Sequence, residues 1–420
     1  MKRLLITLAV ALLAIGTWAQ ETNKILEAVK ADPQKAYGTD YPYGFVMGEL
    51  TKSPKGYKPF YISHYARHGS RYYWSDQLYM QLDTILTLAH DQHKLTQEGE
   101  AFYSRFMDCK EELMTGVSEL TERGWQQHQQ IARTMYNRFP EVFEKGGHIF
   151  AISSLSGRCV ISMSAFCQEL TQCNPALEIR EQSSRFTLDG VVPDDKQNPK
   201  RREFPTVKPR YEQSSVKLPR DFSLYKRITD RVFTSTEGIK GAMFLAGQLK
   251  NLYTSLPSIG HEGLMGNIIT DDEIVNEWEV SNLGSYSWVF GPQYKMIPIL
   301  EDFLKKAQDV IDGKSADVAS LRFGHDTCLG PLTVLMGING ADKDPEDPYE
   351  VKNIYQNYQT CKASNIQWVF YRSKKAGEPI LMKCLLNGSE ATLPIATDTF
   401  PYYKWTDVYA YYSAKCKSVK

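Results

Sequence analysis

The chain has 420 residues, which suggests two or three domains, or one large domain with an insertion. Hydrophobic residues account for 42% and charged residues for 23% of it, which is typical of a globular protein and argues against a disordered, collagen-like or coiled-coil chain. The 49 basic residues balance the 49 acidic ones, so no overall field attracts nucleic acid, and we expect no nucleic-acid partner. An anion site must therefore come from a local cluster of basic groups.

The first twenty residues are typical of a secretory signal peptide. Lys2 and Arg3 precede an apolar run, Leu4–Gly16, which is too short to span a bilayer comfortably. Thr17-Trp18-Ala19 then offers small residues to a signal peptidase. We therefore expect residues 1–20 to be removed and the protein to be exported, either to the periplasm or out of the cell, with no membrane span after cleavage. An uncleaved N-terminal anchor is the alternative.

The chain has eight cysteines, and an even number permits disulfide bonds in an exported protein. Several of them lie in apolar segments and are expected to be core residues. We expect one or two bridges at most, with Cys167–Cys173 and Cys361–Cys416 as the candidates. There is no paired CxxC motif, so a structural zinc site is not expected.

Apolar runs and amphipathic segments alternate along the chain. In order, they predict a strand at Phe60–Ala66, two helical segments of which the second opens at Thr121, a strand at His148–Ser153, a helix at Arg158–Leu170, a strand at Val318–Phe323 and a helix at Thr327–Gly337. Thr121 is a favourable N-cap, and Ile131, Met135 and Phe139 recur after it at helical spacing. Between the helix at Arg158–Leu170 and the strand at Val318–Phe323, residues 193–314 are more polar and largely helical in pattern.

The C-terminal part returns to strands. Trp368–Tyr371 and Ile380–Leu386 are expected strands, and Asn387-Gly388 after the second is a strong hairpin signal. Asn387-Gly388-Ser389 also fits a glycosylation sequon, but the turn explains it better. The aromatic tail from Tyr402 to Tyr412 is expected to form a packed terminal helix.

This alternation of strands and helices predicts an α/β fold. We expect a mainly parallel central sheet flanked by helices, a three-layer α/β/α sandwich, with an inserted helical cap. The α/β core is assigned to residues 21–71, 120–194 and 315–420. The mainly helical cap insertions are assigned to residues 72–119 and 195–314.

Three side chains that can carry positive charge follow the first strand, in Arg67-His68-Gly69-Ser70-Arg71. Open α/β sheets bind ligands at the carboxyl ends of their strands. Gly69 lets the backbone turn sharply. Arg67 and Arg71 can each give paired hydrogen bonds to a phosphate, and His68 between them can attack phosphorus. The alternative interpretation is a solvated turn with basic side chains.

A second polar cluster, Phe323-Gly324-His325-Asp326-Thr327, also follows a predicted strand and opens a helix, whose free N–H groups favour an anion. Asp326 can donate a proton to a leaving oxygen, and His325 can hold a phosphate oxygen. An Asp at a helix start is also simply a common N-cap. Arg158 follows the strand that ends at Ile152-Ser153-Ser154. Three strand ends thus bring basic and acid–base groups to one edge of the sheet.

At this point the sequence resembles the histidine acid phosphatases, the second branch of the histidine phosphatase superfamily, which also includes phytases and multiple inositol polyphosphate phosphatases. Arg67–Arg71 matches the R-H-G-x-R signature, and His325-Asp326 matches the later H-D pair. Ser153–Arg158, with Ser164-Ala165-Phe166 downstream, is similar to the segment with the third phosphate arginine. Leu120–Gln127 resembles the L-T-x-x-G-x-x-Q helix. The resemblance extends from about residue 60 to 390.

The resemblance implies a role for each of six residues. His68 would be the nucleophile and form a phosphohistidine, and Asp326 would protonate the leaving alcohol and then help to activate water. The residues that would bind the phosphoryl oxygens are Arg67, Arg71, Arg158 and His325. No metal and no cofactor is required, because the arginines supply the positive charge.

The sequence departs from the family pattern after Arg71, where the usual proline two residues on is replaced by Tyr73. This change concerns the rim of the pocket and not the chemistry. The multiple inositol polyphosphate phosphatases replace the aspartate of the H-D pair with Ala-Glu, whereas this chain keeps Asp326. We therefore expect a phosphomonoesterase that accepts simple monoesters, with inositol phosphates as possible but not exclusive substrates.

Two alternatives remain open. The first is an inositol-polyphosphate phosphatase or phytase with the same catalytic residues. The second is a non-catalytic phosphate- or phosphosugar-binding protein, which would have no need of the proton donor Asp326. His90 and His93 have the spacing of metal ligands but lie in a polar segment and are expected in a solvated loop. The basic residues between Lys196 and Arg220 are expected on a solvated surface rather than as a clamp for a highly phosphorylated substrate.

Overall fold

The structure is a computed structural model in which residues 24–45 and 47–419 are described. The expected signal peptide at residues 1–20 lies outside the described residues. None of the helices in the two described ranges combines the length and the apolar character needed to cross a membrane.

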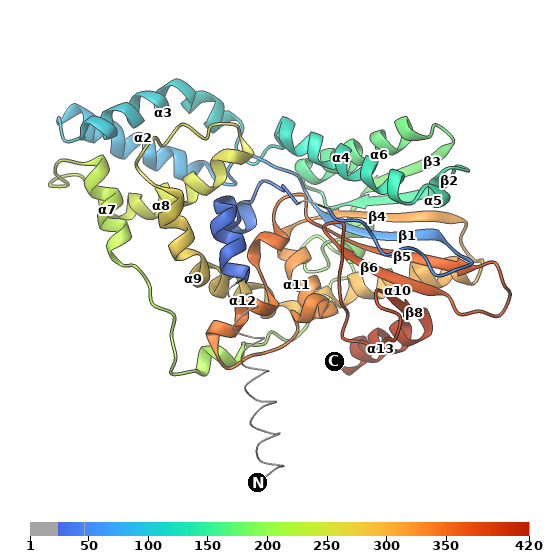
Figure 1. Cartoon of the computed structure of the whole chain (residues 1–420). Helices are drawn as coiled ribbons and strands as arrows, with labels where there is room; N and C mark the ends of the chain where they lie inside the picture. Colours follow the sequence, from blue (N-terminus) through green and yellow to red (C-terminus); the bar gives the residue numbers. More distant parts are fainter. Residues whose placement is uncertain (1–23, 46, 420) are drawn as a thin grey trace, which may run out of the picture.

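The centre of the molecule is a mixed sheet (Figure 1). Its order is β3-β2-β4-β1-β5-β6-β7, with β8 paired to β6. The strands are β1 (Tyr57–Arg67), β2 (Gly147–Ser153), β3 (Leu177–Ser183), β4 (Asp317–Gly324), β5 (Asn365–Ser373), β6 (Leu381–Leu386), β7 (Ser389–Glu390) and β8 (Tyr402–Lys404). The pairs β3–β2, β2–β4 and β4–β1 are parallel, whereas β5 runs antiparallel to β1 and the later strands continue in antiparallel pairs. The expected mainly parallel sheet is therefore wrong for the second half, and the parallel first half is the part that collects carboxyl ends at one edge.

Helices cover both faces of the sheet, which confirms the predicted three-layer sandwich. On β1, Tyr61 and Tyr65 belong to one buried cluster and Ile62 and Ala66 to another, as strand alternation requires. One face is covered by α4 (Glu122–Arg138), α5 (Pro140–Phe143) and α6 (Gly157–Cys173). The other face is covered by α10 (Ile297–Ile311), α11 (Asp326–Met336) and α13 (Trp405–Ser418).

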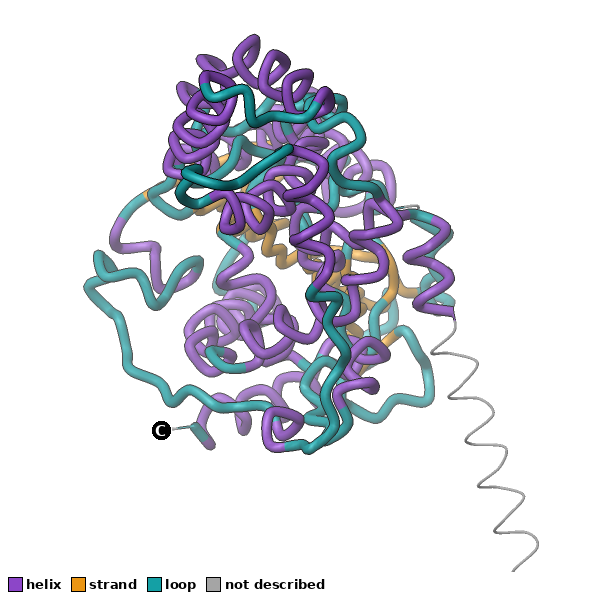
Figure 2. Tube along the Cα trace, turned by 90° about the vertical axis from the view of Figure 1, so that its left-hand side faces the viewer, coloured by secondary structure: helices purple, strands orange, loops and turns teal. Residues whose placement is uncertain are grey.

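A further group of helices has its own apolar core and lies beyond the end of the sheet where β1 and β4 finish (Figure 1). It contains α2 (Asp76–Asp91), α3 (Gln97–Thr115), α7 (Ser223–Val232), α8 (Ala242–Ser255) and α9 (Asp271–Phe290), together with the 3-10 helix η1 (Pro33–Asp40). Seen from this side, these helices stand in front of the strands (Figure 2). Within residues 195–314, therefore, α7 to α9 lie in this helical group, while α10 packs on the sheet. The division into core and cap remains a prediction.

Two expectations for the C-terminal part have different outcomes. Asn387 and Gly388 both have positive φ, 51° and 76°, and join β6 to β7, so the predicted hairpin is confirmed. The terminal helix α13 begins only at Trp405, because Tyr402–Lys404 instead pairs with β6 as β8. The expected helix from Tyr402 is therefore wrong over its first three residues.

The expected disulfide bonds are also wrong. All eight cysteines lie in the described ranges, all are free, and six of them are buried. Cys167 and Cys173 lie six residues apart on the single helix α6, which places them on different faces of it. Five of the buried thiols pack as small apolar side chains in the clusters already described, and Cys159 instead contacts the carbonyl of Gly324.

Candidate active site

The register of the parallel strands brings three chain segments together at one edge of the sheet. Arg67 at the end of β1 is paired with Gly324 at the end of β4, and Ser153 at the end of β2 is paired with Phe323. Just beyond these pairs, the His68 N–H donates to the carbonyl of Gly324 (2.9 Å). All six residues singled out in the sequence follow one of these three strand ends.

His68 lies at the centre of the group and its side chain is buried. Its Nδ1 is 2.8 Å from the carbonyl oxygen of Gly69, and because a carbonyl only accepts, Nδ1 carries the proton. The lone pair of Nε2 is therefore free. Burial, and then the charges of Arg67, His325, Arg71 and Arg158, hold the pKa of His68 well below its usual range. The ring thus stays neutral and nucleophilic at acidic pH.

The loop that carries His68, residues 67–71, is held by the start of α4 and by α6. The N–H of Ser70 donates to the side-chain oxygen of Gln127 (2.8 Å), and the N–H of Gly69 donates to Ser162 (3.1 Å). A Cβ on Gly69 would lie 2.4 Å from the carbonyl oxygen of Gly124, so only glycine allows this approach. The segment from Leu120 to Gln127 thus has a structural role: it fixes the backbone on either side of His68.

The three arginines have guanidinium groups that are only partly satisfied. Arg67 donates through Nη1 to the carbonyls of Thr39 (2.8 Å) and Thr360 (3.1 Å). Arg71 donates to the carbonyl of Tyr72, and Arg158 donates to the hydroxyl of Ser118. In all three, however, the Nε atom is buried and has no hydrogen-bond partner within residues 24–45 and 47–419.

Unused buried donors of this kind are costly unless a ligand accepts from them. The charges of all three arginines also lower the pKa of His68, so each of them acts on the position of its ring. The three arginines are therefore the candidate site for a tetrahedral anion.

His325 and Asp326 open helix α11 next to this group. The ring of His325 lies 5.6 Å from that of His68, centroid to centroid, and its Nε2 is 3.0 Å from the hydroxyl of Ser154. Burial, followed by the charge of Arg158, lowers the pKa of His325 to about 4. Ser154 is thus a further residue of the candidate site. It lies in the segment Ser153–Arg158, in which the sequence singles out only Arg158.

Asp326 is the acidic residue of the group, and its carboxylate forms an ion pair with Nη2 of Arg67 at 3.0 Å. Burial acts to raise the pKa of its carboxyl, but the charges of Arg67, Arg71 and His325 and a hydrogen bond from the N–H of Thr327 together hold the pKa below its usual range. The carboxylate is therefore ionised in this unliganded arrangement. The N-cap of α11 is His325, so Asp326 is not needed as the cap.

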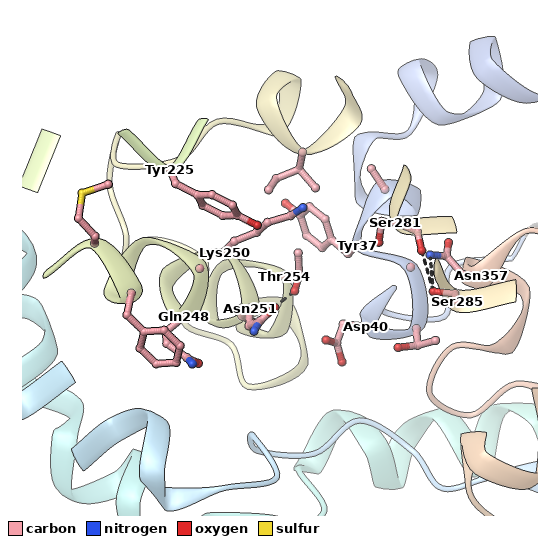
Figure 3. Close-up of a pocket in the computed structure, with 17 residues that line it drawn as sticks. Tyr37, Asp40, Tyr225, Gln248, Lys250, Asn251, Thr254, Ser281, Ser285 and Asn357 are labelled. Atoms are coloured by element: carbon pink, nitrogen blue, oxygen red, sulfur yellow. Dashed lines mark hydrogen bonds between the residues drawn. The ribbon is translucent and has the colours of Figure 1, made fainter. Parts of the chain in front are cut away.

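A cavity of about 580 Å³ lies beside the arginines, between η1 and helices α7, α8 and α9 (Figure 3). Two of its lining residues link it to the site: the carbonyl of Thr39 accepts from Arg67, and the charge of Asp40 acts on Arg71. Most of the remaining lining is uncharged, with aromatic, amide and hydroxyl groups from Tyr37, Tyr225, Phe244, Gln248, Asn251, Thr254, Ser281, Ser285 and Asn357. Lys250 is the lining lysine, and it lies 4.0 Å from the carboxylate of Glu277.

The other charged candidates lie elsewhere. His90 is in α2, where its Nδ1 is 2.6 Å from Glu100 and its ring stacks on Tyr103, so it is not in the expected loop. Among the described residues, no three His, Cys, Asp or Glu side chains are grouped to hold a metal ion. In the basic segment 196–220, Arg201 pairs with Asp194 and Arg202 with Glu301.

Arg210 in the same segment pairs with Glu346, and no residue of the segment lines the cavity. Arg220 at its end lies near enough to contribute to lowering the pKa of Lys250, after burial. These contacts agree with the expected solvated surface for most of the segment.

Several residues beside the site carried no signal in the sequence. Thr39, Asp40, Thr360 and Lys362 come from η1 and from the segment before β5, and they reach the 67–71 loop only through the fold. None of them belongs to a motif or follows a strand of the parallel half of the sheet.

No protein-family model and no curated protein sequence matches the chain. Solved structures do match. The multiple inositol polyphosphate phosphatase of Bifidobacterium longum, in complex with inositol hexasulfate, superposes with a TM-score of 0.67 and 19% identity over 91% of this chain and 98% of that one.

Two phytases share the same fold. The phytase of D. castellii has a TM-score of 0.65 and 13% identity over 91% of this chain and 85% of its own. The phytase of Hafnia alvei, in complex with tartrate, has a TM-score of 0.52 and 12% identity over 86% of this chain and 98% of its own. At these identities the likeness concerns the fold, and the predicted α/β architecture with its helical addition is that of phosphatases of this kind.

Proposed function

We propose that the protein is an exported histidine acid phosphatase that hydrolyses phosphate monoesters through a phosphohistidine, without a metal ion. The observation that carries the proposal is the neutral imidazole of His68 among three arginines whose buried Nε–H donors have no partner in the described structure. The shared fold of a multiple inositol polyphosphate phosphatase and of phytases supports it. The motifs R-H-G-x-R and H-D support it independently.

In the first step the phosphoryl group binds among Arg67, Arg71 and Arg158, which pair with its oxygens. Nε2 of His68 attacks phosphorus with its free lone pair, and the bond from phosphorus to the ester oxygen breaks as the N–P bond forms. Asp326 gives its proton to the departing oxygen, so an alcohol leaves and not an alkoxide.

In the second step water attacks the phosphohistidine. The carboxylate of Asp326 takes a proton from the water as the new O–P bond forms, and the N–P bond breaks to return the lone pair to His68. Inorganic phosphate leaves and Asp326 is protonated again. The arginines stabilise the charge on the equatorial oxygens in both steps, which is the role that metal ions have in other phosphoryl-transfer enzymes.

Asp326 is ionised in the unliganded site, yet the first step needs its proton. A bound phosphate ester supplies negative charge to Arg67 and Arg71, the same groups that hold the pKa of Asp326 down. Binding therefore raises the pKa of Asp326 and makes it an acid when the substrate is in place. This coupling favours turnover at acidic pH, where His68 is still neutral.

The lining of the cavity beside Arg67 favours a substrate whose leaving group carries little charge. A substrate with many phosphates gains from several lysines or arginines around the reacting group. This cavity has Lys250, which Glu277 offsets, and the carboxylate of Asp40. We therefore favour simple monoesters as substrates, with inositol phosphates as accepted but not exclusive ones.

The proposal is tested by trapping the intermediate. Wild-type protein and the His68→Ala variant are mixed with a radiolabelled aryl phosphate, quenched in alkali and examined for label at histidine, with and without a strong chelator. We expect an alkali-stable phosphoenzyme in the wild type under both conditions and none in the variant. Turnover by His68→Ala at a tenth of the wild-type rate, or loss of wild-type activity in chelator that zinc or magnesium restores, would refute the mechanism.

A further inference from the structure

A lysine with no assigned role lies behind the 67–71 loop. The side chain of Lys362 is 1% exposed. Its neighbours hold the loop: the N–H of Ala363 donates to the carbonyl of His68 (2.9 Å), and the carbonyl of Thr360 accepts from Arg67 (3.1 Å). Lys362 is therefore part of a segment that supports the backbone of His68 and the side chain of Arg67.

The ammonium group of Lys362 joins three parts of the chain. It forms an ion pair with Asp40 of η1 at 2.5 Å and donates to the hydroxyl of Ser258 at 3.0 Å. The carbonyl of Ser258 in turn accepts from the hydroxyl of Thr121, which also donates to the carbonyl of Ser70. One cation thus connects η1, the segment after α8 and the 67–71 loop.

The charges of this group reach the arginines of the site. Burial and the charges of Arg71 and Arg67 lower the pKa of Lys362 to about 8, against the effect of Asp40. Burial also lowers the pKa of Arg71, and the charge of Asp40 opposes that shift. The carboxylate of Asp40 therefore acts on two cations: Lys362, with which it is in direct contact, and Arg71.

A buried ion pair is a poor source of stability compared with an apolar pair of similar volume, so its presence beside a site points to another use. If Lys362 were absent, the carboxylate of Asp40 would lose the cation with which it pairs and would be left to attract Arg71, on which its charge already acts. That pairing would draw the guanidinium away from the anion and cancel one positive charge at the site.

We propose that Lys362 is a positioning residue of the phosphate site: by engaging Asp40 it leaves Arg71 free for the phosphoryl group and keeps the net charge of the site positive. This inference deepens the proposed function and rests on it. It concerns affinity for the phosphoryl group, so its signature is in KM and in inhibition by inorganic phosphate more than in kcat.

The test compares two buried lysines at about pH 5, where an amine is protonated. Lys383 on β6 is the matched control, because its side chain is also 1% exposed and also pairs with an acid, Glu390, at 2.6 Å. We expect Lys362→Met to raise the inhibition constant of inorganic phosphate and the KM of an aryl phosphate by about tenfold, as for the loss of one charge beside a bound anion. Lys383→Met is expected to lower Tm and leave both constants unchanged.

Two further variants separate charge from structure. Removing both charges, in Asp40→Asn with Lys362→Met, restores the net charge of the site, so the inhibition constant should return toward the wild-type value although stability is lost at both positions. Asp40→Asn alone should lower the inhibition constant, and this variant gives the answer if Lys362→Met does not fold.

Equal effects of Lys362→Met and Lys383→Met on the two constants would overturn the inference. A double variant whose inhibition constant for inorganic phosphate stays as high as that of Lys362→Met would also overturn it. An unchanged or raised inhibition constant in Asp40→Asn would do the same. A wild-type protein that neither turns over an aryl phosphate nor binds phosphate would instead overturn the proposed function. The two failures are therefore distinguishable.

Discussion

At the scale of single residues, the site depends on charges that oppose one another. His68 stays neutral because burial and nearby cations disfavour its protonated form, while Asp326 stays ionised because the groups around it, first Arg67 and Arg71, oppose the effect of burial. The pKa values of the proposed nucleophile and of the proposed acid thus both depend on Arg67 and Arg71. A phosphate ester that binds to these arginines therefore changes the pKa of His68 and the pKa of Asp326 together.

This arrangement leads to a prediction for Asp326→Asn. Esters with poor leaving groups, such as alkyl phosphates, need the proton from Asp326, whereas aryl phosphates have good leaving groups and need it little. We expect the variant to lose at least about a hundredfold in kcat/KM on an alkyl phosphate, within the range for general acid catalysis, and clearly less on an aryl phosphate. Equal losses measured on the two substrates would argue against a general acid.

At the scale of the elements, the packing behind the site also contains histidines. His64 of β1 and His128 of α4 are fully buried and lie against the rings of Phe166 and Phe323. Burial lowers the pKa of His128 to about 3, and burial with the charge of His128 holds the pKa of His64 well below its usual range. Both rings are therefore neutral in the folded protein.

The sign of the resulting pH dependence follows from linkage. In the unfolded chain both histidines bind protons below about pH 6.5, but in the folded protein they do not, so stability falls as the pH falls from about 6.5 toward 3. Each contributes a slope of up to about 1.4 kcal/mol per pH unit. We expect His128→Phe to flatten the decrease in Tm between about pH 6 and 4. His148→Phe on β2 is the control, since its side chain is 56% exposed, and an equal flattening there would contradict this account.

Several of the helices and strands that surround the candidate site can be predicted from the sequence. Apolar runs predict β1, β2 and β4, and the N-cap Thr121 marks the start of α4, where its hydroxyl accepts from the N–H of Gly124. The six candidate residues lie at or just after these strand ends, so local patterns suffice to single them out. Asp40 and Ser258 end short 3-10 helices and Lys362 lies before β5, and only the tertiary fold brings the three together.

The misplaced start of the terminal helix has a physical reason too. Tyr402 and Tyr403 have the aromatic content of either a packed helix or a strand, and pairing with β6 decides in favour of the strand. The helical pattern of residues 193–314 says nothing about which core each helix joins, because both cores are built from the same kinds of apolar side chain.

At the scale of the whole molecule, the proposed function gives the cavity between η1 and the helices α7 to α9 the role of holding the leaving group of the ester. We expect the ratio of kcat/KM on inositol hexakisphosphate to that on an aryl phosphate to stay below about a hundred, a preference of roughly 2.7 kcal/mol. Adding a cation to the lining, in Thr254→Lys, should raise this ratio, whereas Ala414→Lys at an exposed position of α13 should not. A wild-type ratio above that limit would favour the phytase alternative.

The strand order also has a consequence for how the molecule is made. β1 lies between β4 and β5, so Ile62 pairs with Ala319 and with residues near Val369. The halves of the site are thus separated by some 250 residues of chain, and the first strand has neither neighbour until the last third has been synthesised. Contacts so distant in sequence form slowly. During most of synthesis the 67–71 loop therefore exists without His325 and Asp326, which complete the candidate site. We expect phosphatase activity to appear only after the nascent chain is released and its sheet has formed.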